Sequence, residues 1–316
     1  GDLYLRGGGD PLLTSQQLFN MALQLKNFGI KEIKGNFFYD DKLLFKKHEV
    51  SSIGVGNQTY NPSVSSLSVN FNQFFLIKNK SPKLFSPIPN LSHFNIKKKL
   101  QIFSKNIRFK SILRGPNRET WILNKNIKYD FLERLPVKRP SLFTAMLFRH
   151  YCKQLGIKLS FPKLKKTPLQ NGLIISNNHS KSVLEISELL LEYSNNLTAE
   201  LLLLNASRKN KSKEVITLRN SAQIMSQWFK EKFPSIFSND FSIINGSGLT
   251  PYNFITAQSL SQFLFKIKNK SFKNRYFWTL FSLAGINGWP KGNMLEKLYN
   301  HNVWSKTGSL DYVNLQ

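Results

Sequence analysis

The spacing of apolar residues changes once along the chain, near Pro168, and this change constrains the fold more than any other feature. From Ile30 to about Thr120, short apolar stretches alternate with Asn, Ser, Pro and Lys, a pattern typical of strands. After Pro168 the apolar residues recur at helical spacing. We predict helices around 182–204, 217–232 and 256–268, and a final strand over 303–314. A strand-rich half followed by a helix-rich half predicts an α/β or α+β protein of two parts.

The strand-rich half also contains two predicted helices. Thr14 and Gln17 form a capping box at the start of the first, and Gly29 ends it. The second runs from about 141 to 155 and ends at Gly156. Both helices have apolar residues at helical spacing.

Composition excludes several classes of protein. The 316 residues are 41% apolar and 13% aromatic, which excludes a disordered chain and is enough for about two domains. The single cysteine, Cys152, excludes an internal disulfide and a cysteine zinc cluster, and we expect it to be a small core residue. No apolar run is long enough for a transmembrane helix. The chain starts at Gly1 without a signal peptide, so we expect a processed chain or one whose front is missing.

The formal net charge of +27 raises the alternative of a nucleic-acid-binding protein. The densest basic patch lies between Lys97 and Arg118, with Phe103 and Phe109 among its lysines and arginines. The basic residues are otherwise spread along a chain rich in Lys, Asn, Phe and Ile, and no DNA- or RNA-reading motif accompanies them. We therefore expect no nucleic-acid partner.

Other candidate catalytic and phosphate-binding motifs lack the flanking residues that their chemistry requires. The three glycines at 7–9 precede Asp10 and lack a following Gly-Lys-Ser/Thr, so they predict a tight turn instead of a phosphate loop. Ser247 has a glycine on each side, but a nucleophile elbow needs glycine two places away, where Asn245 and Leu249 stand. The five histidines have no metal-ligand spacing, so we expect no metal site.

Two short motifs carry chemistry. Ser194-Asn195-Asn196 lies between two apolar helical segments, and Lys306-Thr307-Gly308 lies on the predicted final strand. The first pattern also occurs at 68–70, 104–106 and 176–178, so it has no weight alone. Together, in this order, they are two of the three elements of penicillin-recognising serine enzymes. A lysine and a hydroxyl on one strand can hold a peptide carboxylate, and glycine lets the substrate approach closely. Ser194 and Asn196 could relay a proton and orient the peptide.

The sequence resembles the bacterial D-alanyl-D-alanine carboxypeptidase/endopeptidases of the penicillin-binding protein 4 type over nearly its whole length. The similar segments are Gly1 to Thr14, Gly29 to Gly35 with Asp40-Asp41, Tyr60 to Asn72, Asn245-Gly246-Ser247-Gly248-Leu249, Ala284 to Gly288, and Ser305-Lys306-Thr307-Gly308-Ser309-Leu310. In the fourth and fifth of these segments, asparagine replaces the aspartate of the family pattern.

The resemblance implies a transpeptidase/β-lactamase-like α/β (α+β) domain with a large strand-rich insertion. It implies a serine acyl-enzyme acting on peptidoglycan stem peptides and β-lactams in the periplasm or cell envelope, without metal or cofactor. It implies that Ser194 relays a proton and Asn196 holds the substrate amide. Lys306 and Thr307 would bind the terminal carboxylate beside Gly308, and the backbone N–H of Ser309 would form half of the oxyanion hole.

The family's nucleophile motif, Ser-x-x-Lys, is expected upstream of this chain. The one match inside it, Ser160-Phe161-Pro162-Lys163, follows a strand-like stretch and contains a proline, whereas the motif must open a helix. We interpret it as a chance match. We therefore expect the chain as given to lack its nucleophile and to be inactive alone, and to be incomplete at both ends.

We assign residues 1–175 to inserted modules and 176–316 to part of the catalytic domain. A non-catalytic peptidoglycan-binding homologue that has lost its nucleophile stays an alternative, with the nucleic-acid-binding protein a weaker one. Surface association with wall or membrane, the balance of carboxypeptidase and endopeptidase action, and the oligomeric state stay open.

Overall fold

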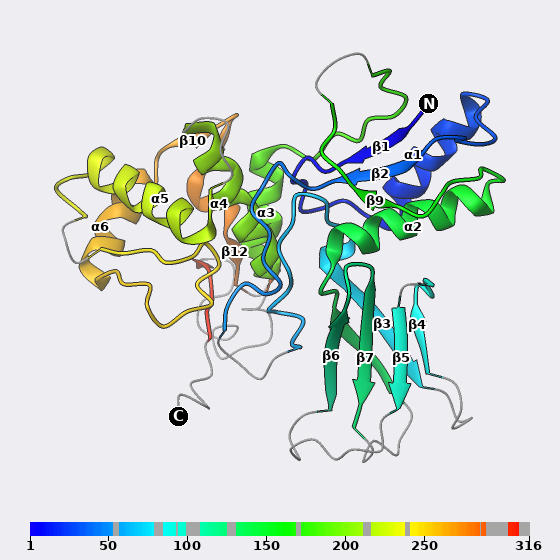
Figure 1. The fold of residues 1–316 in the computed structure, drawn as a ribbon. Coiled ribbons are helices and arrows are strands. Elements are labelled where there is room, and N and C mark those ends of the chain that lie inside the picture. The colour runs from blue at the N-terminus through cyan, green and yellow to red at the C-terminus, as the bar shows by residue number, and fades with distance from the viewer. Residues whose placement is uncertain are drawn as a thin grey trace. The chain divides into compact units, whose positions relative to one another are not determined.

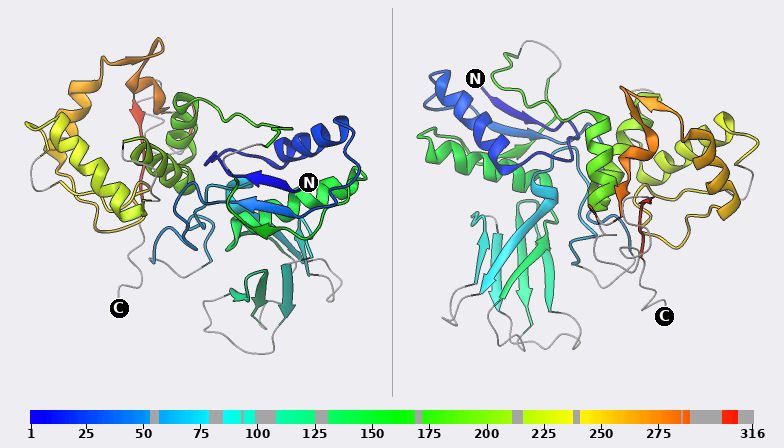
Figure 2. Two further views of the ribbon diagram at one scale, coloured as in Figure 1. Left: turned by 45° about the horizontal axis from the view of Figure 1, so that its top comes forward. Right: turned by 180° about the vertical axis from the view of Figure 1, so that it is seen from behind.

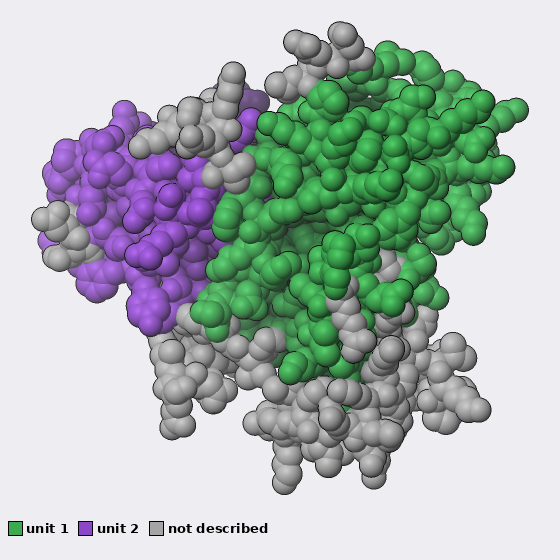
Figure 3. Space-filling model, in the orientation of Figure 1, with its two compact units in different colours: residues 1–180 green, residues 181–316 purple. Residues whose placement is uncertain are grey.

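The structure, a computed structural model, describes residues 1–52, 57–78, 85–92, 94–98, 108–124, 131–168, 172–210, 216–237, 241–284, 286–288 and 303–309. It divides into two compact units, Gly1–Ser180 and Lys181–Gln316, which Figure 3 colours separately. Helices and sheets occur in both units, so the mixed α/β (α+β) class predicted from the sequence is confirmed.

Unit 1 begins with a small parallel sheet covered by two helices (Figure 1). Its strands are β1 (Leu3–Arg6), β2 (Phe37–Asp40) and β9 (Lys163–Leu164), with β2 in the middle. The helices α1 (Ser15–Asn27) and α2 (Pro140–Gln154) pack side by side, as the two further views also show (Figure 2). Phe148 of α2 meets Phe37 of β2 with 5.8 Å between ring centroids.

The two helices begin and end as the sequence predicts. Thr14 and Gln17 form the expected capping box of α1, and Gly29 follows the helix with a φ of +85°. Gly156 follows α2 with a φ of +84°. Cys152 is completely buried in α2, which confirms it as a core residue, and burial raises the pKa of its thiol to about 12.

The rest of unit 1 is a β-sandwich of two three-stranded sheets (Figure 1). One sheet has the order β4-β3-β8 and the other β5-β7-β6. The strands are β3 (Gln73–Lys78, after a 3-10 turn at Asn70–Asn72), β4 (Phe85–Ile88), β5 (Phe94–Lys98), β6 (Phe109–Arg114), β7 (Arg118–Leu123) and β8 (Phe131–Pro136). Phe74 of β3 meets Trp121 of β7 edge to face between the sheets, and one apolar cluster joins the sandwich to the helices.

Unit 2 consists mainly of helices, namely α3 (Val183–Tyr193), α4 (Asn196–Asn210), α5 (Leu218–Lys232) and α6 (Ala257–Ile267). The predicted helix over 182–204 is therefore two helices, whereas those near 217–232 and 256–268 are confirmed as single ones. Two short hairpins follow: β10 (Ser271–Phe272) with β11 (Arg275–Tyr276), and β12 (Ser282–Leu283) with β13 (Trp304–Ser305). A 3-10 turn at Phe277–Leu280 (η2) connects them.

The final strand differs from its prediction. We expected a strand over 303–314 that carries Lys306-Thr307-Gly308, but β13 ends at Ser305 and residues 306–309 follow it without strand pairing. Residues 310–316 lie outside the described part of the chain. The placement of Lys306, Thr307 and Gly308 on the strand is therefore wrong for all three residues, because β13 ends directly before Lys306.

Candidate active site in unit 2

The break between α3 and α4 places Ser194 and Asn196. Ser194 has a left-handed backbone, with φ +54°, and its N–H donates to the carbonyl of Leu190 at 2.8 Å, so it ends α3. The Asn195 side-chain oxygen then accepts from the N–H of Thr198 at 2.9 Å and caps α4. The middle residue of the motif is thus structural. Ser194 is exposed and Asn196 is half-buried at the start of α4.

A tight turn is fixed against the first part of α4. Glu200 is fully buried, and its two carboxylate oxygens accept from the N–H groups of Gly246 at 3.2 Å and Ser247 at 3.0 Å. A Cβ on Gly246 would lie 3.0 Å from the carbonyl oxygen of Ala199, a tight contact that a larger residue could relieve only by moving the turn a little away from the helix. Asn245 closes the turn by accepting from the N–H of Gly248 at 3.0 Å. Ser247 is therefore part of a structural turn and not of a nucleophile elbow.

The Lys-Thr-Gly segment leaves the β12–β13 hairpin. Ser305 pairs with Ser282 and Trp304 with Leu283, and the Trp304 ring meets Trp278 with 4.3 Å between centroids. Lys306 comes directly after this pairing. It is exposed, its ammonium group donates to the carbonyl of Thr307, and desolvation lowers its pKa.

The turn after β12 lies near the end of α3, the helix that Ser194 ends. The Asn287 side chain accepts from the N–H of Leu283 at 2.8 Å and closes this turn. Gly288 has φ +71°, and a Cβ on it would lie 2.2 Å from the Ser282 hydroxyl oxygen and 3.4 Å from the carbonyl oxygen of Glu192. Glu192 lies two residues before Ser194, and Ser282 is the strand partner of Ser305, which precedes Lys306. The end of α3 and the start of the Lys-Thr-Gly segment therefore lie on either side of Gly288.

A bidentate ion pair holds α3 to the neighbouring hairpin. The Arg275 guanidinium of β11 donates to the two carboxylate oxygens of Glu188 at 2.6 and 2.8 Å. This contact lowers the pKa of Glu188 and raises that of Arg275. It fixes the helix that ends at Ser194 relative to the segment that leads to β12.

The remaining predicted site residues are Thr307, Gly308 and Ser309. Thr307 is half-buried, and Gly308 and Ser309 are exposed. A Cβ on Gly308 would meet no atom of the described chain within 4 Å, so packing inside this part of the protein does not require a glycine there.

Ser160 and Lys163, which match the nucleophile motif inside the chain, make hydrogen bonds to residues near the start of β2. Ser160 lies in unit 1 on extended backbone before β9, and its hydroxyl oxygen accepts from the N–H of Phe37 at 2.8 Å. The Lys163 ammonium group donates to the side-chain oxygen of Asn36 at 3.0 Å. The two side chains do not stack on a helix turn, which supports our interpretation of a chance match. Among the described residues no group of His, Cys, Asp or Glu is arranged to hold a metal ion, and none of the described helices could cross a membrane.

The sequence reasoning missed the residues that hold the site together, Asn195, Glu200, Asn287 and Gly288. One signal was available, because Glu200 lies on the same helical face as Leu197 and Leu204, where a charge needs a partner. No comparable signal marks the contact that Gly288 makes with Ser282.

Comparison with known proteins adds one family and one relative. The profile of the D-Ala-D-Ala carboxypeptidase 3 (S13) family matches residues 1–315. The chain is 24% identical over 335 aligned positions to D-alanyl-D-alanine carboxypeptidase DacB of Haemophilus influenzae, which covers 99% of this chain and 67% of that protein.

Two solved structures of penicillin-binding protein 4 from the same organism are similar in fold. The first has a TM-score of 0.78 at 20% identity and covers 98% of this chain and 70% of its own. The second, in complex with a β-lactam, has a TM-score of 0.73 at 20% identity and covers 98% and 69%. The penicillin-binding fold expected from the sequence is thereby confirmed.

Proposed function

The chain belongs to the D-Ala-D-Ala carboxypeptidase 3 (S13) family of serine peptidases, and from this premise we propose that its unit 2 carries part of the site that binds the D-Ala-D-Ala end of peptidoglycan stem peptides. The observation that supports the proposal is the position of Gly288, which lies beside Ser282, the strand partner of the residue before Lys306, and near the carbonyl of Glu192, two residues before Ser194. The related protein from H. influenzae is a D-alanyl-D-alanine carboxypeptidase, and its structure is known with a β-lactam bound.

Lys306 and Thr307 bind the substrate's terminal carboxylate in this proposal. The lysine supplies a cation and the threonine a hydroxyl, and a charge-assisted contact of this kind is worth about 1.5–3 kcal/mol. The lowered pKa of Lys306 supports the role, because a less solvated ammonium group gives up less hydration when it binds a carboxylate. A Cβ placed on Gly308 would meet no atom of the described residues within 4 Å, which leaves room for the substrate backbone beside this part of the chain.

Ser194 and Asn196 act on the other side of the substrate. The cap formed by Asn195 fixes the backbone between them, so that Asn196 can hold the substrate amide and Ser194 can relay a proton to the leaving group. The backbone N–H of Ser309 supplies one donor of the oxyanion hole. We assign no nucleophile within this chain, because Ser160 already accepts a backbone hydrogen bond in an extended segment.

The substitution Lys306→Ala tests the carboxylate assignment in the product of the complete reading frame. We expect acylation by a fluorescent penicillin to slow by about tenfold or more, because the variant loses a charge-assisted contact. Lys270→Ala, an exposed lysine of the same unit, is the matched control and should leave the rate unchanged. An unchanged rate in a folded Lys306→Ala protein would show that Lys-Thr-Gly does not bind the carboxylate.

A second arm tests the nucleophile. The 316-residue chain alone should form no covalent adduct with penicillin, as seen by intact mass after denaturation, because neither Ser194 nor Ser247 has a lysine one helical turn away to deprotonate it. The product of the complete reading frame should be labelled. A labelled Ser160 would overturn the assignment, and a complete product that binds peptidoglycan but is never labelled would favour the non-catalytic homologue.

We place the protein in the periplasm as a cell-envelope enzyme. Its stem-peptide substrate lies there, and the H. influenzae relative bears the name of a penicillin-binding protein. Both carboxypeptidase and endopeptidase action are compatible with a site in which Lys306 binds a carboxylate of the substrate and Asn196 binds an amide.

A further inference from the structure

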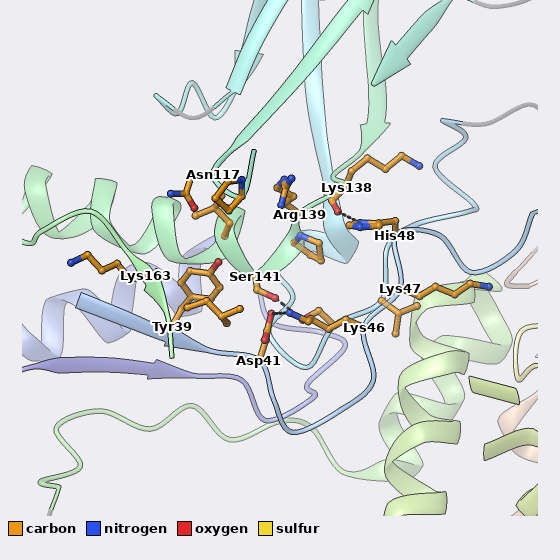
Figure 4. A pocket seen from close by; sticks show the side chains of 16 residues that line it. Tyr39, Asp41, Lys46, Lys47, His48, Asn117, Lys138, Arg139, Ser141 and Lys163 are labelled. Carbon is orange, nitrogen blue, oxygen red and sulfur yellow. Dashed lines mark hydrogen bonds and ion pairs between the residues drawn. The ribbon is translucent and has the colours of Figure 1, made fainter. Parts of the chain in front are cut away.

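A cavity of about 460 Å³ is lined by residues of unit 1 alone. It opens where the end of β2, the 41–48 loop, the β6–β7 turn and the start of α2 meet (Figure 4). Its walls are largely apolar and include Val64, Pro116, Pro140, Leu142 and Leu164. A cavity of this size suits a small organic molecule.

The start of α2 supplies uncapped donors to this cavity. No side chain caps the helix, and its first residue is Pro140, which has no N–H. The N–H groups of Ser141 and Leu142 follow, and both residues line the cavity. The first N–H groups of a helix have no partner within the helix and favour negative charge.

Arg139 adds a cation to the cavity. Its backbone N–H donates to the buried Glu119 carboxylate at 3.0 Å, but its guanidinium donates to the carbonyl of Gly115, a neutral group, and its buried Nε has no partner among the described residues. Figure 4 shows that the side chains of Lys47, Lys138 and Lys163 point away from the centre of the cavity. We therefore take Arg139 as the cation that faces a bound ligand.

Tyr39 supplies a further donor beside Arg139. Burial, and the nearby Asp41 carboxylate, raise the pKa of its hydroxyl to about 12, so the hydroxyl stays protonated at neutral pH. The one acid of the cavity, Asp41, has its charge offset by Lys46 at 3.1 Å. Its second oxygen is buried and has no partner among the described residues, so it can accept from a hydroxyl group of a ligand.

We propose that this cavity binds a small organic anion, whose head group lies among Arg139, Tyr39 and the N-terminus of α2 and whose body lies against the apolar wall. The donors converge on one side of the cavity, while the apolar residues form the remainder. An uncharged molecule would leave the Arg139 guanidinium without a counter-charge, and an inorganic ion would leave the apolar wall uncovered.

Calorimetric titration of the 316-residue chain with benzoate, phenol and inorganic phosphate tests the proposal. We expect benzoate to bind more tightly than either of the others. Equal binding of phenol would overturn the role of the charge, and equal binding of phosphate would overturn the role of the apolar wall. No heat from benzoate up to its solubility limit would overturn the site.

Variants locate the binding. Arg139→Gln should weaken benzoate binding about tenfold or more, because it removes a charge-assisted contact. Arg134→Gln, an exposed arginine on β8 outside the cavity, is the matched control and should leave the affinity unchanged. Because Arg139 also contacts Gly115, Tyr39→Phe provides a second variant that removes only a hydroxyl and should weaken binding several-fold. Equal affinity in Arg139→Gln, Tyr39→Phe and Arg134→Gln would place benzoate elsewhere.

Discussion

Glu119 is a fully buried carboxyl whose titration should be measurable in the stability of the protein. It lies on β7, and its oxygens accept from the Trp121 indole N–H at 2.8 Å and from the backbone N–H groups of Lys138 at 3.0 Å and Arg139 at 3.0 Å. Burial outweighs these donors and raises its pKa from 4.5 to about 7. The charged form is therefore less favourable in the folded state than in the unfolded one.

The direction and size of the effect follow from linkage. A carboxyl whose pKa is raised on folding stabilises the protein least when it is ionised, so the free energy of unfolding falls as the pH rises from 4.5 to 7. Because one pKa unit is worth about 1.4 kcal/mol, the contribution of Glu119 amounts to about 3 kcal/mol. Below pH 4.5 this penalty is absent, and above pH 7 it is complete.

The substitution Glu119→Gln removes the titration and keeps the size of the side chain. Its amide nitrogen cannot accept a hydrogen bond, so the variant loses about 1–3 kcal/mol at every pH. The difference in unfolding free energy between variant and wild type should then shift by about 3 kcal/mol in favour of the variant between pH 4.5 and 8. Urea denaturation at a series of pH values measures this difference. Glu32→Gln, at an exposed glutamate of the same unit, controls for the loss of one negative charge.

A second observable reports on the same group without denaturation. Trp121 is the single tryptophan of residues 1–180, and its indole N–H donates to Glu119. Its ¹⁵N–¹H signal, assigned by its loss in Trp121→Phe, should shift with pH near 7 in the wild type and stay constant in Glu119→Gln. Parallel stability curves for wild type and variant, together with an indole signal that does not move, would refute the reasoning.

Two further predictions concern unit 2. Gly288→Ala should destabilise unit 2 by about 2–4 kcal/mol, because the new Cβ would lie 2.2 Å from the Ser282 hydroxyl oxygen and the backbone has a positive φ. Adding Ser282→Gly to this variant should restore part of the lost stability, measured by thermal denaturation. If it restores none, the strain does not arise from the contact with Ser282. Glu200→Ala should cost about 1–3 kcal/mol, because the N–H groups of Gly246 and Ser247 lose their acceptor; Glu200→Gln should cost less in the same assay, and equal losses would argue against the hydrogen bonds.

The features that the sequence predicted well are local ones. The capping box at Thr14 and the glycine at 156 fix helix ends through contacts within a few residues, so the pattern alone contains the information. The break at Ser194 was visible as a polar motif between apolar segments, but its cause, the Asn195 cap, depends on which of three polar side chains points back to the helix. The early end of β13 could not be predicted, because strand pairing is decided by the partner β12 and not by the strand itself.

The nearness of the two motifs depends on a contact that no local pattern contains. Ser194 and Lys306 are more than a hundred residues apart, and Gly288 lies beside both Ser282 and the carbonyl of Glu192 near the end of α3, where a Cβ would overlap the Ser282 side chain. A sequence does not distinguish such a glycine from one that a turn requires. Gly288 meets both requirements, because its φ is positive and a Cβ on it would overlap the Ser282 side chain. The asparagines at 245 and 287 close the two turns of this unit through side-chain oxygens, which aspartate also possesses. Replacing the family's aspartate by asparagine therefore keeps the acceptor that each turn needs and removes two negative charges from the surroundings of a site proposed to bind a carboxylate.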